Sequence, residues 1–155
     1  IGGTDVGKRR VDEDLVNGVA NCKVKSLYLG NNSLLRDESV EMIASVFSSL
    51  EVLDLSSCCG ISEGVVEVLR RYCEVRHLSL AFCSGVELAG LSFEVPKLEE
   101  LNLSCSGVDD EILSVISKCC CGLLHLDLEK CTRLREINLG SCYEVGANVV
   151  AWMVY

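Results

Sequence analysis

Residues 50–55 read L-E-V-L-D-L, and their apolar positions, Leu50, Leu53 and Leu55, have the spacing L-x-x-L-x-L. This spacing or a close variant recurs along the chain at Val24/Leu27/Leu29, Leu50/Leu53/Leu55, Val75/Leu78/Leu80, Leu98/Leu101/Leu103 and Leu123/Leu126/Leu128. The last apolar residues of successive copies are 26, 25, 23 and 25 residues apart. A unit of this length is too small to bury its apolar face alone, so the spacing predicts a stack of repeats.

A sixth copy of the pattern, Leu134/Ile137/Leu139, breaks this period, because Leu139 follows Leu128 by only 11 residues. Two strands joined by so few residues cannot form a parallel crossover, which needs a dozen or more residues. We therefore predict that a strand at 134–139 fails to join the sheet in register, or joins as an irregular or antiparallel edge. Residues 143–155 should form a poorly anchored cap with a partly exposed Trp152. A deletion or a misassigned exon would explain the short step.

The segments between the apolar copies have the period of amphipathic helices. Apolar residues at i, i+3, i+4 and i+7 occur at Val40/Ile43/Ala44/Phe47, Val65/Val68/Leu69/Tyr72 and Ile112/Val115/Ile116/Cys119. Residues 12–22 have a similar spacing and are interpreted as the closing helix of a preceding unit. Helix starts are predicted at polar residues that can accept hydrogen bonds from free N–H groups: Asp12, Asp37, Ser62 and Asp109. Residues 85–96 contain Gly90 and end in Pro96, so their helix should be short or irregular.

Strand, turn and helix in alternation, joined by right-handed crossovers, predict an α/β fold of the leucine-rich repeat type. In this ribonuclease-inhibitor-like right-handed α/β superhelix, parallel strands line the concave face and helices cover the convex face. We assign 1–155 to a single leucine-rich repeat domain. Within it, 1–23 are the tail of a preceding repeat, 24–131 are regular repeats, and 132–155 are a truncated, irregular C-terminal repeat or cap. Because the sequence begins at Ile1 and not at Met, we expect a piece of a longer protein.

The composition narrows the possible classes of function. With 49% apolar residues among 155, the chain can bury a sizeable core. The formal net charge is -9 and the longest basic run is Lys8-Arg9-Arg10, which disfavours nucleic acid and anionic membranes as partners. No apolar stretch approaches the roughly 20 residues of a membrane span, and no signal segment opens the sequence, so a soluble protein is expected.

Eleven cysteines would suit a disulfide framework, but the number is odd and most positions follow the repeat. Four stand three residues after the last apolar residue of a copy, a place that Asn32 and Ser106 take in two other units: Cys58, Cys83, Cys131 and Cys142. We predict that this ladder of inward side chains bonds backbone groups left free after each strand. Three further cysteines precede strands: Cys22, Cys73 and Cys120. Reduced thiols imply the cytoplasm and/or the nucleus, with disulfides as the alternative.

Alternation within each strand sends the leucines into the core and the residues between them to the concave face. That face is predicted to show Ser26, Tyr28 and Gly30; Val52, Asp54 and Ser56; His77, Ser79 and Ala81; Glu100, Asn102 and Ser104; and His125, Asp127 and Glu129. Our candidates for binding a protein substrate or peptide are Tyr28, Asp54, His77, Phe82, Glu100, Asn102, His125 and Asp127. Tyr28 and Phe82 are the aromatic anchors of a surface that is otherwise polar and mildly acidic.

One row of side chains on this face has the residue types of a metal-binding or acid–base site. His77, Glu100 and His125 take the same place in three successive strands, with neighbours about 4.8 Å apart. The imidazoles would then lie about 9 to 10 Å apart, too far to share a zinc ion unless the side chains converge. No C-x-x-C pair has zinc-site spacing, and the sequence has no Gly-rich phosphate loop, H-E-x-x-H or G-x-S-x-G. We therefore predict no catalytic residue, no metal and no cofactor.

Three stretches carry a more specific resemblance: L-E-V-L-D-L-S-S-C-C-G-I-S at 50–62, Y-C-E-V-R-H-L-S-L-A-F-C at 72–83 and C-G-L-L-H-L-D-L-E-K-C at 121–131. They resemble the cysteine-containing leucine-rich repeat, and 135–154 resemble the C-terminal repeats of plant F-box/leucine-rich repeat proteins. The resemblance implies the substrate-recognition arm of an SCF-type ubiquitin ligase, which acts in ubiquitin-dependent protein catabolism. Docking on the ligase adaptor would need an upstream F-box, which these 155 residues do not contain. The alternative is a sensor or regulatory segment of a nucleotide-binding immune receptor or another signalling protein.

Overall fold

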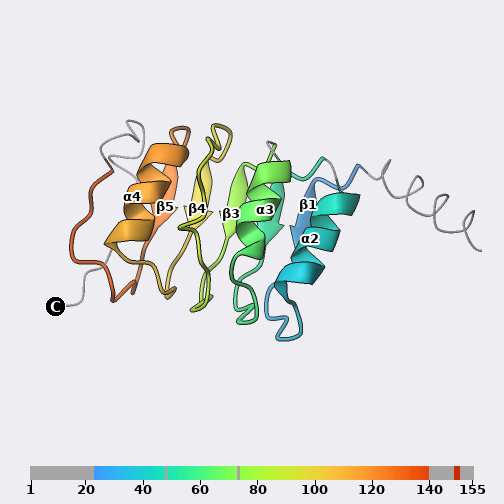
Figure 1. Ribbon diagram of the computed structural model, residues 1–155, viewed down its shortest axis with the longest axis horizontal. Coiled ribbons are helices and arrows are strands. Elements are labelled where there is room, and N and C mark those ends of the chain that lie inside the picture. Colours follow the sequence, from blue (N-terminus) through green and yellow to red (C-terminus); the bar gives the residue numbers. More distant parts are fainter. Residues whose placement is uncertain (1–22, 48, 73, 140–148, 151–155) are drawn as a thin grey trace, which may run out of the picture.

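The computed structural model describes residues 23–47, 49–72, 74–139 and 149–150. Its elements are β1 Ser26–Tyr28, α2 Asp37–Val46, β2 Val52–Asp54, α3 Gly64–Arg71, β3 His77–Ser79, β4 Glu100–Asn102, α4 Asp110–Cys119, β5 His125–Asp127 and β6 Val149–Val150. The strands form one sheet in the order β1-β2-β3-β4-β5-β6, and each neighbouring pair is parallel. The helices α2, α3 and α4 all cover the same face of this sheet (Figure 1). The predicted α/β leucine-rich repeat solenoid is confirmed.

Each strand contributes its central leucine to one row across the sheet. The register aligns Leu27, Leu53, Leu78, Leu101 and Leu126. The last four of these are at most 3% exposed, and the leucines two positions further on are also buried: Leu55, Leu80, Leu103 and Leu128. Full burial of such a side chain stabilises the fold by about 1.5 to 3 kcal/mol. The periodic leucines therefore build the core between the sheet and the helices, as predicted.

The three segments with helical period form α2, α3 and α4, whereas residues 85–96 form only turns and bends. In α3, Val65, Val68 and Leu69 are buried, so the one-sided apolar pattern covers the core side of the helix. The irregular segment agrees with its composition, because glycine weakens a helix and proline cannot donate the next backbone hydrogen bond.

Of the three predicted helix caps that the structure describes, only one forms the expected hydrogen bond at the start of its own helix. Asp109 is the N-cap of α4, and its Oδ1 accepts a hydrogen bond from Ile112 N at 3.1 Å. The predictions for Asp37 and Ser62 are wrong, because α2 and α3 begin without a side-chain cap bond. The Asp37 carboxylate instead accepts hydrogen bonds from Ser62 N at 2.8 Å and Ser62 Oγ at 2.6 Å. These two residues link neighbouring repeats to each other.

The turn after each of the first five strands contains one residue in the left-handed region, and the turns stack along the solenoid. These residues are Asn31, Ser57, Phe82, Cys105 and Lys130, with φ between 55° and 62°. The N–H of each of the first four donates to a carbonyl of the next turn: Asn31 N to Ser56 O, Ser57 N to Ala81 O, Phe82 N to Ser104 O and Cys105 N to Glu129 O, at 2.7 to 2.8 Å. The parallel hydrogen bonding of the sheet thus continues past the strand ends.

The sixth strand is not at 134–139, which form no strand. The structure instead pairs Leu126 with Val149, and the step of 23 residues equals that from Leu78 to Leu101. Leu134 N donates to Cys131 O, as Ile61 N does to Cys58 O, so Leu134 occupies the end of a turn. The prediction that 134–139 fail to join the sheet is confirmed, but the short step does not reflect a missing unit. A parallel strand within the predicted cap was not foreseen.

Several predictions concern residues outside the part that the structure describes: the helix at 12–22, Asp12, Cys22, Cys73, Cys142 and Trp152. The domain boundaries likewise remain predictions. Within the described ranges, none of the helices has the length and apolar character that crossing a bilayer requires.

Candidate functional site

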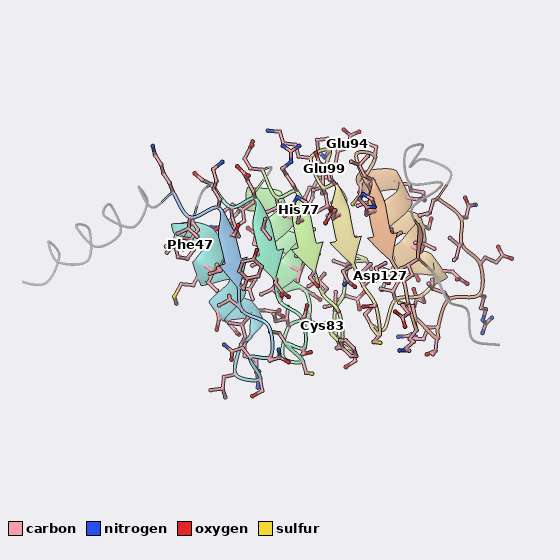
Figure 2. All side chains as sticks on the ribbon, turned by 180° about the vertical axis from the view of Figure 1, so that it is seen from behind. Phe47, His77, Cys83, Glu94, Glu99 and Asp127 are labelled. Atoms are coloured by element: carbon pink, nitrogen blue, oxygen red, sulfur yellow. The ribbon has the colours of Figure 1, made fainter. Side chains whose placement is uncertain are left out.

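The face of the sheet opposite the helices carries a groove of about 370 Å³. It crosses β1 to β5 and is lined by the outward side chains of the strands, among them Tyr28, Asp54, His77, Glu100, Asn102, His125 and Asp127. Figure 2 looks onto this face, with His77 on β3 and Asp127 near the end of β5. Seven of the eight candidate residues therefore share one continuous surface, because the parallel register stacks equivalent positions side by side.

Tyr28 is the large exposed aromatic side chain of the groove, with 69% of its surface accessible. It lies on β1 in register with Asp54 of β2. Val52 of β2 adds a half-buried apolar side chain to the lining. An exposed aromatic beside an aliphatic group offers a partner apolar area at one end of the groove.

His77 and Glu100 form the one direct polar pair of the His77/Glu100/His125 row that the structure records. His77 Nδ1 lies 2.8 Å from Glu100 Oε2, and both side chains are substantially exposed. Across the described residues, no three or more His, Cys, Asp or Glu side chains gather in a way that would hold a metal ion. The ordinary reading of this row is an exposed imidazole-carboxylate pair.

Asp54, Asn102 and Asp127 occupy equivalent places at the ends of their strands and perform the same structural task. Asp54 Oδ1 accepts hydrogen bonds from Ser56 N at 2.8 Å and Ser56 Oγ at 2.5 Å. Asn102 Oδ1 accepts the same two bonds from Ser104, at 2.9 and 2.7 Å, and Asp127 Oδ1 accepts one from Glu129 N at 2.9 Å. Each side chain thereby folds the start of the turn, as Asx residues commonly do.

Two parts of the predicted concave surface lie elsewhere. Ala81 and Ser104 are buried, at 6% and 9% exposure, because the chain has already left the strand and turned inward at these positions. Phe82 is 58% exposed, but it belongs to the turn after β3 and does not line the groove. A strict alternation of two residues holds only while the backbone stays extended, and each strand here spans three residues.

The thiols after the strands point into the core and bond backbone carbonyls of the preceding repeat. Cys58 Sγ donates to Leu29 O at 3.2 Å, Cys83 Sγ to Leu55 O at 3.2 Å, and Cys131 Sγ to Leu103 O at 3.1 Å. Burial raises the pKa of all three thiols, so they stay protonated and unreactive at neutral pH.

The two non-cysteine residues at this place bond differently. Ser106 is buried, and its Oγ lies 3.8 Å from Cys131 Sγ. Asn32 is half-buried, and its Oδ1 accepts a hydrogen bond from Leu34 N at 3.1 Å. The described cysteines are all free thiols.

The amino ends of the strands carry a row of ion pairs that the sequence reasoning missed. Lys25 pairs with Glu51 at 2.6 Å, and Arg76 pairs with Glu99 of the next unit. Lys97 and Glu74 add a further pair at 2.6 Å. The residues directly before β1 to β4 are Lys25, Glu51, Arg76 and Glu99, so alternating sign at one repeat position was a readable signal. Figure 2 shows Glu99 at this upper edge, opposite the turn that contains Cys83.

The comparisons with known proteins bear on the fold. A family model described as "Leucine Rich repeat" matches residues 20–44 and 96–117. A solved structure titled tropomodulin C-terminal domain, from Caenorhabditis elegans, is similar with a TM-score of 0.55 and 13% sequence identity, covering 86% of this chain and 88% of that one. No curated protein matches the chain. The spaced leucines, the parallel register and these two similarities together show that the chain has the α/β solenoid fold of leucine-rich repeats.

Proposed function

We propose that this chain is a non-catalytic protein-interaction module that receives a segment of a protein partner in its concave groove. The groove across β1 to β5, with Tyr28 exposed at one end, is the observation that carries the proposal. Stacked repeats offer such extended concave surfaces for binding, and aromatic side chains supply a large share of the affinity at protein interfaces.

The groove has the chemistry of recognition and not of catalysis. Asp54 and Asn102 are committed to the turns that follow their strands, and His77 lies against Glu100. Among the described side chains of the groove there is no thiol, so an activated cysteine nucleophile is not part of this surface.

At a finer level, we propose that the module is the substrate-recognition arm of an SCF-type F-box protein in the cytoplasm and/or the nucleus. Support comes from the resemblance to the cysteine-containing repeat and from the common bonding of Cys58, Cys83 and Cys131. Free thiols at these positions suit a reducing compartment. Under this proposal the bound protein is a substrate for ubiquitination.

The test is capture of partners by the full-length gene product, comparing wild type with Tyr28→Ala. Met42→Ala is the matched control, because Met42 is similarly exposed, at 67% against 69%, but lies on α2 and outside the groove. We expect Tyr28→Ala to reduce recovery of the specific partner several-fold and Met42→Ala to leave it unchanged. Equal recovery with both variants would place binding outside the groove.

The same capture experiment also tests the proposed role in a ubiquitin ligase, by whether the ligase adaptor is recovered. If the full-length product is an F-box protein, we expect the ligase adaptor to be recovered with every variant, because it would dock through the F-box and not through the groove. Recovery of a specific partner without the adaptor, from a longer protein that contains a P-loop, would favour the immune-receptor alternative.

A further inference from the structure

We propose that the segment received by the concave groove is an extended basic peptide with two Lys or Arg side chains four residues apart. This inference rests on the proposed function and names the chemistry of the partner. It follows from the charge of the groove, from the hydrogen bonding of its carboxylates, and from the spacing that the strand register imposes.

The charge of the groove is unbalanced. Asp54, Glu100 and Asp127 line it, and no Lys or Arg is among its lining residues in the described part of the chain. Cations at the nearby edge of the sheet are already paired, Lys25 with Glu51 and Arg76 with Glu99. A partner with positive side chains would therefore meet a complementary surface.

In each groove carboxylate, one oxygen contacts another group of the protein and the second oxygen can accept a hydrogen bond from a partner. Asp54 Oδ1 and Asp127 Oδ1 accept backbone hydrogen bonds from Ser56 and Glu129, and Glu100 Oε2 lies against His77. Within the described residues no hydrogen bond is recorded to Asp54 Oδ2, Asp127 Oδ2 or Glu100 Oε1. Because the turn bonds already hold the Asp54 and Asp127 carboxylates in place, a cation that binds these two costs little further side-chain entropy.

The spacing of the carboxylates selects an extended peptide. Asp54 is in register with Ser79, Ser79 with Asn102, and Asn102 with Asp127. Three strand spacings of about 4.8 Å put the two aspartates about 14 Å apart. An extended chain rises about 3.4 Å per residue and alternates its side chains, so residues i and i+4 lie about 14 Å apart on the same face.

The same register predicts the neighbouring contacts. Residue i+2 of the peptide would face Ser79 and Asn102, which are polar and uncharged. The peptide would run across the strands, and Tyr28 lies one strand beyond Asp54, where it can cover an apolar residue two positions before the first basic one. A second copy of this chain is a poor occupant, because its net charge of -9 is repelled by an acidic groove.

The probes are three synthetic peptides: one with two arginines separated by three neutral residues, one in which the arginines are adjacent, and one with glutamates in place of the spaced arginines. Binding to the full 155-residue chain is measured by fluorescence polarisation at low and at high salt. We expect the spaced basic peptide to bind several-fold more tightly than the adjacent one, and the glutamate peptide not to bind. Affinity should fall as salt rises, because salt screens the attraction between the groove carboxylates and the arginines.

The variant that tests the site is Asp54→Asn/Asp127→Asn. Asn102 already makes the same turn bonds at an equivalent position, so asparagine is compatible with the fold there. The control is Glu38→Gln/Glu111→Gln, which removes two exposed carboxylates from the first turns of α2 and α4. We expect about a tenfold loss of affinity in the first pair and little change in the second. Asn102→Asp should tighten binding.

The contrary outcomes are distinct. Equal loss in both double variants, or no preference for the spaced basic peptide, overturns the inference. Binding of the glutamate peptide, or self-association of the chain that Asp54→Asn/Asp127→Asn abolishes, overturns it as well. The proposed function stands or falls separately, on whether Tyr28→Ala reduces recovery of the natural partner.

Discussion

The contact between Asp37 and Ser62 gives the sharpest test of how neighbouring repeats are held together. Asp37 opens α2, and its two carboxylate oxygens accept hydrogen bonds from Ser62 N at 2.8 Å and Ser62 Oγ at 2.6 Å. Gly64 packs closely on the same side chain, since a Cβ added there would lie 2.7 Å from Asp37 Oδ1. The change we consider is Asp37→Ala, which removes the acceptor and keeps the helix.

The expected cost comes from two charge-assisted hydrogen bonds. Bonds to a charged group contribute about 1.5 to 3 kcal/mol each when buried, and the half-buried position of Asp37 places the pair nearer the lower end. Loss of a negative charge in the first helical turn adds about 0.3 to 1 kcal/mol. We therefore expect Asp37→Ala to lower the free energy of unfolding by about 3 to 4 kcal/mol.

Urea unfolding followed by circular dichroism measures this free energy, provided that the slope is unchanged. Glu38→Ala is the control, because it removes a carboxylate from the same first turn and should cost no more than about 1 kcal/mol. A double-mutant cycle with Ser62→Ala isolates the pair and should give a coupling of about 1 kcal/mol. If Asp37→Ala costs no more than Glu38→Ala, or the coupling is zero, the inter-repeat link does not stabilise the fold.

Four further outcomes are expected. Hydrogen bonds from Arg135 N and Glu136 N lower the pKa of Asp110. Burial alone would raise the pKa of Asp37, but the hydrogen bonds from Ser62, Glu63 and Gly64 together lower it, so both folded-state pKa values lie below 3.8. The stability that these carboxylates contribute is present above that pH and is lost as the pH falls through the folded-state values, and Asp37→Asn should flatten this acid limb of a stability titration. Gly122→Ala should lower the free energy of unfolding by about 1 to 3 kcal/mol in the same urea assay, because a Cβ there would lie 2.0 Å from Pro96 O. Gly90→Ala is the control and should not destabilise the fold, because a Cβ at Gly90 would have no atom within 4 Å. Mass spectrometry after a brief pulse of iodoacetamide should find the exposed Cys59 and Cys121 modified and the buried Cys58, Cys83 and Cys131 protected until urea is added. Phe82→Asn should raise the midpoint of thermal unfolding, by an amount equivalent to about 1 kcal/mol, because Phe82 has a φ of 59° and asparagine adopts this left-handed conformation at lower cost. An unchanged or lower midpoint would contradict this reasoning.

The core of the fold was predictable because it follows from a period that the sequence states repeatedly. Leu53, Leu78, Leu101 and Leu126 are spaced by 25, 23 and 25 residues, and the sheet aligns them in one row. Once that row is fixed, the parallel register determines which outward side chains become neighbours. The grouping of His77, Glu100 and His125 on one face therefore followed from counting residues.

The same counting failed at the C-terminal end, for a physical reason. Leu134, Ile137 and Leu139 have the spacing of a strand, but Leu134 is the apolar residue that ends a turn, as Ile61 is earlier in the chain. A short apolar pattern does not distinguish these two environments. The register of Val149 against Leu126 in the structure does, because it gives a step of 23 residues that matches an earlier repeat.

Side-chain hydrogen bonds were the least predictable feature of the candidate site. Asp37 and Asp109 both precede an apolar helix face by three residues, yet one reaches to the next repeat and the other caps its own helix. Asp54 and Asp127 were chosen as surface carboxylates, and each also folds its own turn. Local sequence offers such a side chain several acceptable partners, and the position of the neighbouring repeat decides among them.

Phe82 shows where folding and function place different demands on one position. Its backbone has a φ of 59°, a conformation that is costly for a bulky side chain and that Asn31 adopts more readily at the equivalent place. Its ring is 58% exposed, so burial in the core does not compensate for that cost. A residue that weakens the turn and contributes little to the core is difficult to explain by stability alone. An aromatic ring held beside the groove, at the carboxyl ends of the strands, is explained if a bound partner continues over this turn and covers it.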